Sequence, residues 1–463
     1  MNLPFVVGSV TVLVIVVLGW PTARLTSRHA SAAGATAPAT AGLAVAVAVG
    51  LCILTGTSLV PWLLLIALAG WAVYLDARRR GRLVTADDGP GNLALVVAIA
   101  VALLPVLLVD VPAVESDARY IWWFHAGWFR HGGDVTRSGM TEPLFQFSRS
   151  RYPPVLPGVI AVVWHVVDAY GSETALRVSQ LFTVAAVAAA GFHTAAAARL
   201  RGRGAAVLAA VVVGVGWGAN AQVGLVGFAD LAWSSLFVAG AVLLLAGTVE
   251  RRTEWTGAMF AATAALVKFE GQVAAAALLV LVVARAGRDW RRAVPALMVV
   301  GTAVVGWQVV VGVVGAVPDE RGDWGQLVHL LDSDREVHRR LLTTVGHLAG
   351  ELGPLVALAA ATIVTVLLLA RWGGIRLRAP GALTLLAVAS LYLVVVALVF
   401  AVAPEDLGPY LDVAAYRTVI VVRLVVLADL TLVGVAAARA LGLLSEPPVS
   451  PERPEPPEST GPT

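Results

Sequence analysis

Charge and cysteine are both scarce in this sequence. Of 463 residues only 14% are charged and one is a cysteine, whereas 58% are hydrophobic. Soluble domains carry about 25% charged residues, so the composition excludes a water-soluble globular enzyme and a disordered chain. Cys52 alone closes no intrachain disulfide and builds no cysteine metal site. The net charge of +3 is too small to indicate a nucleic-acid partner.

Lysine is almost absent as well, because Lys268 is the only lysine among 33 basic residues. Arginine has replaced lysine wherever a plain cation suffices, as a bias in genome composition would do. The remaining lysine is therefore either a chance survivor or stands where a compact ammonium group is needed.

What the sequence has in abundance is long apolar runs. A helix that spans the hydrocarbon core needs about 20 apolar residues, or fewer where its ends snorkel. The runs predict an all-α, polytopic integral membrane protein with about 13 transmembrane helices. They cover residues 5–20, 41–54, 59–75, 93–109, 178–198, 205–217, 231–248, 257–267, 273–284, 294–317, 355–370, 382–402 and 418–438.

The arginines predict the orientation of these helices. Arginine gathers in alternate short connections, which we place in the cytoplasm. The N-terminus is then outside, and the tail 445–463, rich in proline and glutamate, is a disordered cytoplasmic end. We expect the chain in the plasma (inner) membrane. Its outer connections are 110–177, 218–230, 268–272, 318–354 and 403–417.

Two apolar segments do not fit a simple crossing. Residues 155–167 are short and follow a proline pair, so we expect a juxtamembrane or re-entrant helix on the outer face. Residues 255–284 have arginine on both flanks and must cross twice or not at all. Two helices of about 15 residues reach only about 22 Å each, less than the ~30 Å hydrocarbon core. The turn at 268–271 should therefore be sunk below the outer surface and surrounded by protein.

The outer connections carry charges that membrane insertion alone does not explain. Glu115 and Asp117 lie just beyond a span end, in a loop of a length that is more often functional. Lys268 and Glu270 are ionisable residues at membrane depth, which indicates either a functional site or a mutual ion pair. Together they make the outer face the place to look for chemistry.

Asp230 and Arg417 each have two readings. Asp230 heads a predicted span, where aspartate is either a helix N-cap or a site residue. Arg417 stands before the last span, as a snorkelling residue or as a ligand for an anion. If these charges meet, an outward-facing cavity would hold an anionic lipid head group while a carboxylate acts as general base toward an alcohol. Sugar transfer from a polyprenyl-phosphate donor fits such a site, because nucleotide-sugar donors are cytoplasmic.

Other features have plainer interpretations. The aromatic residues after Asp117 predict an interfacial helix with an aromatic belt. The charged segment 318–354 is interpreted as a solvated helix face, because no spacing in it is diagnostic of a metal site. Arg423 and Asp429 lie deep in the last span and share no face of the helix. The belt residues are Trp122, Trp123, Trp128 and Phe129.

Four short segments resemble the polytopic GT-C glycosyltransferases. The similar branch contains bacterial dolichyl-phosphate-mannose-dependent mannosyltransferase-like and lipopolysaccharide core glycosyltransferase-like proteins. Phe269 replaces the family's usual Asn, His125 stands where Lys is frequent, and only Arg417 carries over from the late outer segment. The resemblance covers roughly residues 93–300. Its segments are Asp117-Ala118 with Ile121-Trp122, Arg151-Tyr152-Pro153-Pro154-Val155-Leu156-Pro157, Ala229-Asp230-Leu231 and Lys268-Phe269-Glu270-Gly271.

The resemblance implies an inverting transfer of a sugar from a polyprenyl-phosphate donor to an acceptor hydroxyl. The acceptor would be a glycan, a lipid or a protein. By this analogy Asp117 is the general base, with Glu115 the reserve, and Lys268 and Arg417 neutralise the leaving phosphate.

The resemblance also implies a substrate-binding set. Asp230 and Glu270 would orient the acceptor, or hold a divalent cation if the enzyme uses one. Tyr152 and His125 would line the same site. The metal dependence itself is left open, and fold analogy does not fix the substrate.

Two further classes of protein stay open as alternatives. A transporter or lipid flippase also places charges in the membrane, but we find no second copy of the short paired helices that inverted repeats would give. A non-catalytic membrane partner leaves Asp117 and Lys268 unexplained, and a polysaccharide polymerase or ligase would share the outer site. We expect N-terminal helices at 1–92, a catalytic module at 93–300 and C-terminal helices at 301–444.

Overall fold

A computed structural model describes residues 3–27, 29–83, 90–113, 117–247, 251–318, 334–372, 382–401 and 407–444. These residues form helices and contain no strand, which confirms the predicted all-α class. Eight of their helices are long and apolar enough to cross a membrane, and four shorter apolar helices accompany them. Each predicted apolar run coincides with a helix, whereas the number of about 13 crossings stays a prediction.

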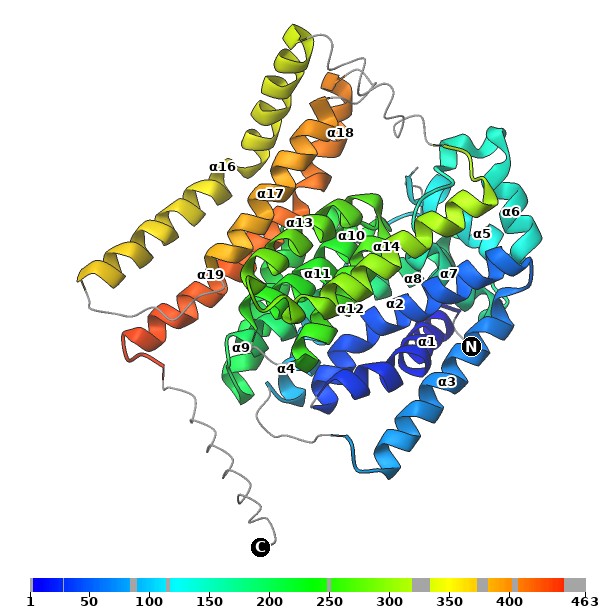
Figure 1. Ribbon diagram of the computed structural model, residues 1–463, viewed down its shortest axis with the longest axis horizontal. Helices are drawn as coiled ribbons and strands as arrows, with labels where there is room; N and C mark the ends of the chain where they lie inside the picture. Colours follow the sequence, from blue (N-terminus) through cyan, green and yellow to red (C-terminus); the bar gives the residue numbers. More distant parts are fainter. Residues whose placement is uncertain are drawn as a thin grey trace, which may run out of the picture.

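The helices follow one another in the order of Figure 1. Those of the first half are α1 (Leu3–Thr26), α2 (Ala30–Thr55), α3 (Leu59–Arg79), α4 (Asn92–Leu108), η1 (Ala118–Trp123), α5 (Phe124–His131), α6 (Gly133–Thr141), η2 (Pro143–Ser148), α7 (Val155–Val167), α8 (Ser172–Ala197) and α9 (Gly202–Gly218). Those of the second half are α10 (Ala221–Leu225), α11 (Asp230–Ala241), η3 (Val242–Ala246), α12 (Arg251–Val267), α13 (Phe269–Ala286), η4 (Trp290–Arg292), α14 (Val294–Val314), α16 (Asp334–Trp372), α17 (Ala382–Ala401), α18 (Leu407–Thr418) and α19 (Ile420–Ala440).

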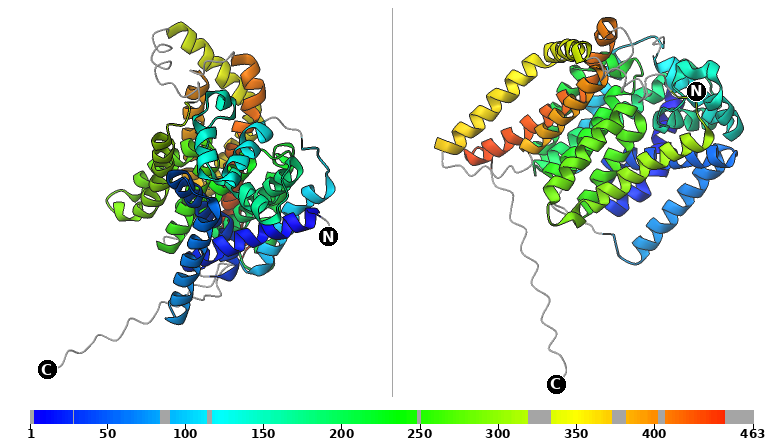
Figure 2. Two further views of the ribbon diagram at one scale, coloured as in Figure 1. Left: turned by 90° about the vertical axis from the view of Figure 1, so that its right-hand side faces the viewer. Right: turned by 45° about the horizontal axis from the view of Figure 1, so that its top comes forward.

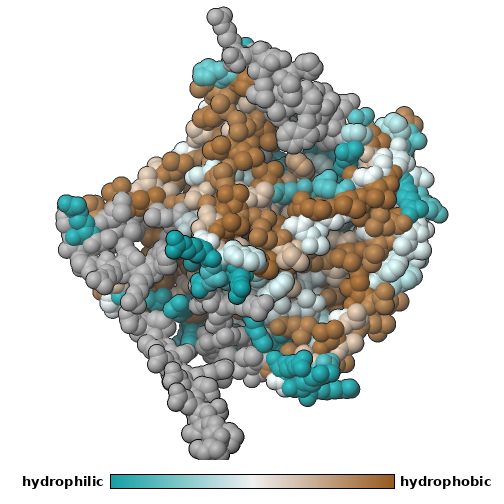
Figure 3. All heavy atoms as spheres, in the orientation of Figure 1, coloured by the Kyte–Doolittle hydropathy of each residue, from teal (hydrophilic) through white to brown (hydrophobic). Residues whose placement is uncertain are grey.

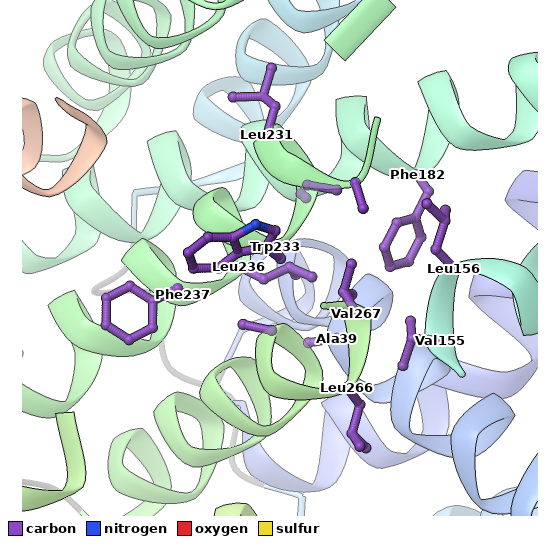
Figure 4. Packing of buried hydrophobic residues seen from close by; sticks show 14 of the residues in the cluster. Ala39, Val155, Leu156, Phe182, Leu231, Trp233, Leu236, Phe237, Leu266 and Val267 are labelled. Carbon is purple, nitrogen blue, oxygen red and sulfur yellow. The ribbon is translucent and has the colours of Figure 1, made fainter. Parts of the chain in front are cut away.

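Helices α2, α8, α11 and α12 form the centre of the bundle. Every residue of α11 is buried, including Trp233 and Phe237. Phe182 of α8 and Leu266 of α12 lie in the same packed region (Figure 4). An apolar helix that is buried on all sides belongs to the interior of a large bundle. The C-terminal helices α16 to α19 extend along one side of this centre (Figures 1 and 2).

The outer surface of the bundle is largely apolar. Helix α3 buries only Leu59, Leu63 and Ala77 along its length, and Leu64 and Leu68 are exposed. Brown, hydrophobic side chains cover much of the face drawn in Figure 3, and hydrophilic groups gather in a few patches on it. Such extended apolar patches are rare on soluble monomers. The surface therefore agrees with the prediction of a membrane protein.

Helix α7 lies in the interior of the bundle, which corrects the prediction of a juxtamembrane helix resting on the surface, whereas the prediction that it is re-entrant is not tested. All residues from Val155 to Trp164 are buried. The helix packs against α1, α2, α5 and α8. Its apolar side chains point in all directions, so burial on every side is the arrangement that removes most apolar surface from water.

The predicted aromatic belt is wrong for the same reason. Trp122, Trp123, Trp128 and Phe129 are all buried. Helices η1 and α5, which carry them, pack on α6, α7 and α8. These rings therefore anchor residues 118–131 to the bundle and do not lie at an interface with lipid.

A sharp hairpin joins α12 to α13 at a single residue. Lys268 is extended, with φ −151° and ψ 154°, and both neighbouring residues are helical. A Cβ on Gly271 would lie 2.2 Å from the carbonyl oxygen of Ala264. Only glycine lets the two backbones approach this closely. The hairpin fixes Lys268 and Glu270 side by side at its tip.

Candidate functional site

Asp230 lies at the centre of a buried cluster of charges. Its Oδ1 accepts a hydrogen bond of 2.6 Å from Lys268 Nζ. Its Oδ2 accepts bonds of 3.1 and 2.9 Å from Nε and Nη2 of Arg417. The N-cap position of α11 is Ala229, and Asp230 is the first helical residue, with its carboxylate bonded to Lys268 and Arg417. The helix-cap reading is therefore wrong, because this carboxylate is used for two cations instead.

Arg417 connects Asp230 to Asp117, the residue before η1. Its Nη1 donates a 2.6 Å hydrogen bond to Oδ2 of Asp117, 300 residues earlier in the chain. The guanidinium carbon lies 4.0 Å from the centroid of the Phe228 ring. Arg417 is buried near the end of α18, so it does not snorkel to an interface. The planar donors of arginine suit this bridging of two carboxylates.

Lys268 completes the cluster from the α12–α13 hairpin. Its Nζ lies 3.0 Å from Oε1 of Glu270 and 2.6 Å from Asp230. The predicted pairing of Lys268 with Glu270 is present, but Asp230 shares it. Oε2 of Glu270 is buried and finds no hydrogen-bond partner within the described residues. A buried polar atom left unpaired costs free energy and indicates a place for a ligand or water.

Exposure increases from the centre of the cluster to its edge. The side chain of Asp230 is 2% exposed, whereas Glu270 is 28% and Asp117 is 42% exposed. Asp117 therefore has the most exposed side chain of the cluster, and the two cations are almost buried behind it. Three carboxylates and two cations give the described cluster a formal charge of −1 when all are ionised.

Tyr152 lies beside the cluster. Its side chain interacts electrostatically with both Lys268 and Glu270. Burial raises the pKa of Tyr152 above its usual range, and the nearby guanidinium of Arg149 offsets part of that rise. The hydroxyl accepts a 2.6 Å hydrogen bond from Arg149 Nη1, and the ring packs on Trp122. Tyr152 is thus in a position to contact a molecule bound at the cluster.

His125 lies in a different environment, among aromatic rings. Its ring stacks on Trp128 with centroids 4.7 Å apart, and Nε2 is 3.2 Å from Oγ of Ser148. Burial lowers the pKa of His125 to about 3. A neutral, packed imidazole is a poor ligand for a phosphate. The geometry therefore gives no support to the prediction that His125 binds substrate.

Two residues near the cluster were not predicted from the sequence. Phe228 offers its ring to Arg417, and a cation–π contact of this kind stabilises a desolvated guanidinium. Tyr392 of α17 is buried, packs on Trp233 and donates to the carbonyl of Thr418, next to Arg417. Both stand in ordinary apolar sequence, so no local signal marks them.

Several predicted features fall outside the cluster or outside the described residues. Glu115 and residues 319–333 of the charged segment lie outside the described residues, and residues 334–354 of that segment belong to α16. Arg423 pairs with Glu351 of α16 at 2.7 Å. Asp429 is buried, and its Oδ1 has no partner in the described part of the chain. Within the same residues no group of three or more His, Cys, Asp or Glu side chains is arranged to hold a metal.

Two cavities are found beyond the cluster. One, of about 420 Å³, is lined by residues that include Asp110, Glu173 and Arg177. The other, of about 250 Å³, lies between α1, α3 and α7. Neither is lined by the charged cluster, so the cavity predicted between Lys268 and Arg417 stays a prediction.

No protein-family model, curated protein or solved structure matches this chain. The resemblance to GT-C glycosyltransferases therefore rests on the four short segments alone. What the described coordinates add is that three of those segments contribute charges to one cluster, and that Tyr152 of the fourth lies beside it.

Proposed function

We propose that this chain is a membrane glycosyltransferase. It would move a sugar from a polyprenyl-phosphate donor to an acceptor hydroxyl on the outer face of the membrane, with inversion. The observation that supports the proposal best is the bridge made by Arg417 between Asp117 and Asp230, with Lys268 on the same aspartate. Ionisable residues at membrane depth are costly, so a shared cluster from four distant segments favours a functional site.

Asp117 is the general base in this proposal. Its carboxylate is the most exposed of the cluster, and Oδ1 makes no hydrogen bond within the described residues, while Oδ2 is held by Arg417. The acceptor oxygen attacks C1 of the sugar, and its proton passes to the Asp117 carboxylate. Contact with Arg417 orients the base, as a positioned carboxylate requires.

Lys268 and Arg417 act on the leaving group. As the bond between C1 and the phosphate oxygen breaks, its electron pair stays on the polyprenyl phosphate. Both cations are already held by Asp230, so their charge is fixed before the substrate arrives. Preorganised positive charge at the departing oxygen lowers the barrier without reorganisation of the site.

The proposal requires that the negative charge of the cluster be offset when the donor binds. A phosphodiester donor would add one negative charge to a cluster whose formal charge is −1. Release of Asp117 from Arg417 on protonation removes part of this excess. A divalent cation would remove the rest, with Glu270 as its carboxylate ligand, because Mg²⁺ is usually held by one or two carboxylates and substrate phosphates and Oε2 of Glu270 has no partner within the described residues.

The direct test measures free polyprenyl phosphate, the product common to every such donor. Purified protein in lipid nanodiscs receives polyprenyl-phosphate mannose, glucose, galactose or arabinose, with an envelope extract of the native cells as acceptor. We expect release from one donor, and a rate lower by about 1000-fold in Asp117→Asn. EDTA separates a metal-dependent from a metal-independent reaction. Absence of release from every donor contradicts the proposal.

The same reconstituted protein distinguishes glycosyl transfer from the alternative, transport. A transporter or flippase would move the labelled donor between leaflets of a sealed vesicle while the bond between sugar and phosphate stays intact. Movement without release of polyprenyl phosphate would replace the proposed transfer by transport. If the Asp117→Asn variant released polyprenyl phosphate at the wild-type rate, the proposed transferase activity would stand but Asp117 would not be its general base.

A further inference from the structure

A narrow apolar groove lies between α1, α3 and α7, away from the charged cluster. It has a volume of about 250 Å³ and is walled by aliphatic side chains from residues 10–18 of α1 and 59–67 of α3. Along α3 this corresponds to a depth of about 12 Å. Its polar lining residues are Ser58, Arg130 and His165, with Arg130 and His165 on the segments that meet at the C-terminal end of α7.

Helices α1 and α3 are joined at the other end of the groove. Trp71 Nε1 of α3 donates a 3.0 Å hydrogen bond to the carbonyl oxygen of Val17 in α1. One turn of α3 lies between Ala67, the last lining residue on that helix, and Trp71. The two helices are thus fastened below the groove and separated within it. Such a slot accepts one end of a chain molecule and stops it at a defined depth.

At the polar end of the groove the lining residue Arg130 pairs with Asp168, a carboxylate that lies beside the groove. Arg130 Nη2 lies 2.7 Å from Oδ1 of Asp168, whose side chain is 90% exposed. The guanidinium also lies over the ring of Tyr170, 5.6 Å from its centroid. Because such an exposed pair contributes little stability, a bound ion can replace or join it at low cost.

We propose that the groove holds a zwitterionic phospholipid with a primary ammonium, as in phosphatidylethanolamine. An acyl chain fills the apolar slot between α1 and α3. The phosphate binds Arg130, which has donors left beyond the one that Asp168 uses within the described residues. The ammonium donates to Asp168, so both Arg130 and Asp168 face a group of opposite charge.

Charge and hydrogen bonding select this head group over the two common alternatives. Phosphatidylglycerol carries the same phosphate but no cation for Asp168, so the repulsion between this phosphate and the carboxylate is not offset. Phosphatidylcholine carries a quaternary ammonium without N–H groups, so it donates nothing to Asp168. The inference does not depend on the proposed glycosyl transfer, because no residue of the groove belongs to the charged cluster.

Native mass spectrometry tests the proposal. The full chain is released from nanodiscs with equal amounts of phosphatidylethanolamine, phosphatidylglycerol and phosphatidylcholine, and the retained lipid is identified. We expect one retained phosphatidylethanolamine, about fivefold preferred over phosphatidylglycerol, because one exposed ionic contact is worth about 1 kcal/mol. Asp168→Asn should bring this preference close to one, and Arg130→Gln should lower the retention of both lipids.

A matched control removes the same charge elsewhere. Asp134→Asn alters an equally exposed aspartate on α6, which lies outside the groove, and should leave the preference unchanged. Melting temperatures of all variants confirm that they fold. Equal retention of the three lipids, or an unchanged preference in Asp168→Asn, overturns the proposal. Displacement of the retained lipid by polyprenyl phosphate would assign the groove to that chain instead and also overturns it.

Discussion

Asp117 and His125 lie eight residues apart on one continuous helical stretch, yet they enter different environments. Asp117 meets Arg417 from the far end of the chain, and its carboxylate stays accessible. His125 is packed between aromatic rings and kept neutral. The Asp117 side chain is held in place by an opposite charge, whereas the His125 imidazole is kept neutral by burial among apolar rings. A polar residue in segment 117–131 is therefore marked as functional only by partners that come from elsewhere in the fold.

Removal of the central carboxylate should have the largest effect on stability. Asp230→Asn leaves Lys268 and Arg417 buried without the anion that they share. Loss of one partner of a buried ion pair costs about 3–5 kcal/mol. We expect a large fall in melting temperature in detergent and no transfer activity.

The matched control for Asp230 is Asp168→Asn, which removes the same charge from an exposed pair. It should change the stability by less than about 1 kcal/mol. If the two variants melted at similar temperatures, the claim that the cluster is a tightly coupled, buried unit would fail.

A smaller effect is expected from Gly271→Ala at the hairpin tip. The added Cβ would collide with the carbonyl of Ala264, and the separation of α12 from α13 should cost about 1–3 kcal/mol. Transfer activity should fall as well, because the same hairpin positions Lys268 and Glu270. Thermal melting and release of polyprenyl phosphate measure the two effects.

Gly301→Ala in α14 is the control for this substitution, because a Cβ there meets nothing within 4 Å. Alanine is the better helix former, so stability should stay equal or rise by up to about 1 kcal/mol. A similar loss in both variants would show that the close approach of α12 and α13 is unimportant.

The smallest effect concerns the pH dependence set by His125. Its pKa of about 3 in the folded protein lies below the ordinary 6.5, so below pH 6.5 the unfolded chain binds the extra proton. Stability is therefore lost as the pH falls from 6.5 toward 3. Between pH 7.5 and 5 the loss from this group is about 2 kcal/mol. His125→Gln should remove that part of the pH dependence, as measured by unfolding at both pH values; an unchanged slope would contradict the assignment.

The sequence was sufficient for the helical class and for most of the cluster. Apolar runs located the helices, and the cost of charge in a membrane singled out Asp117, Asp230, Lys268, Glu270 and Arg417. Local sequence was insufficient to predict features that depend on how the helices pack against one another. The burial of α7 and of the aromatic rings after Asp117, and the use of Asp230 as a bridge in place of a cap, depend on helices distant in the chain.

The most direct test of the central claim compares Asp117→Asn with His125→Gln in one release assay for polyprenyl phosphate, using the donor that the wild-type protein turns over. Both variants are expressed, inserted and reconstituted in the same way. We predict a loss of about 1000-fold for Asp117→Asn and a change of no more than about threefold for His125→Gln. Equal losses in the two variants, or near-normal release by Asp117→Asn, would contradict the account.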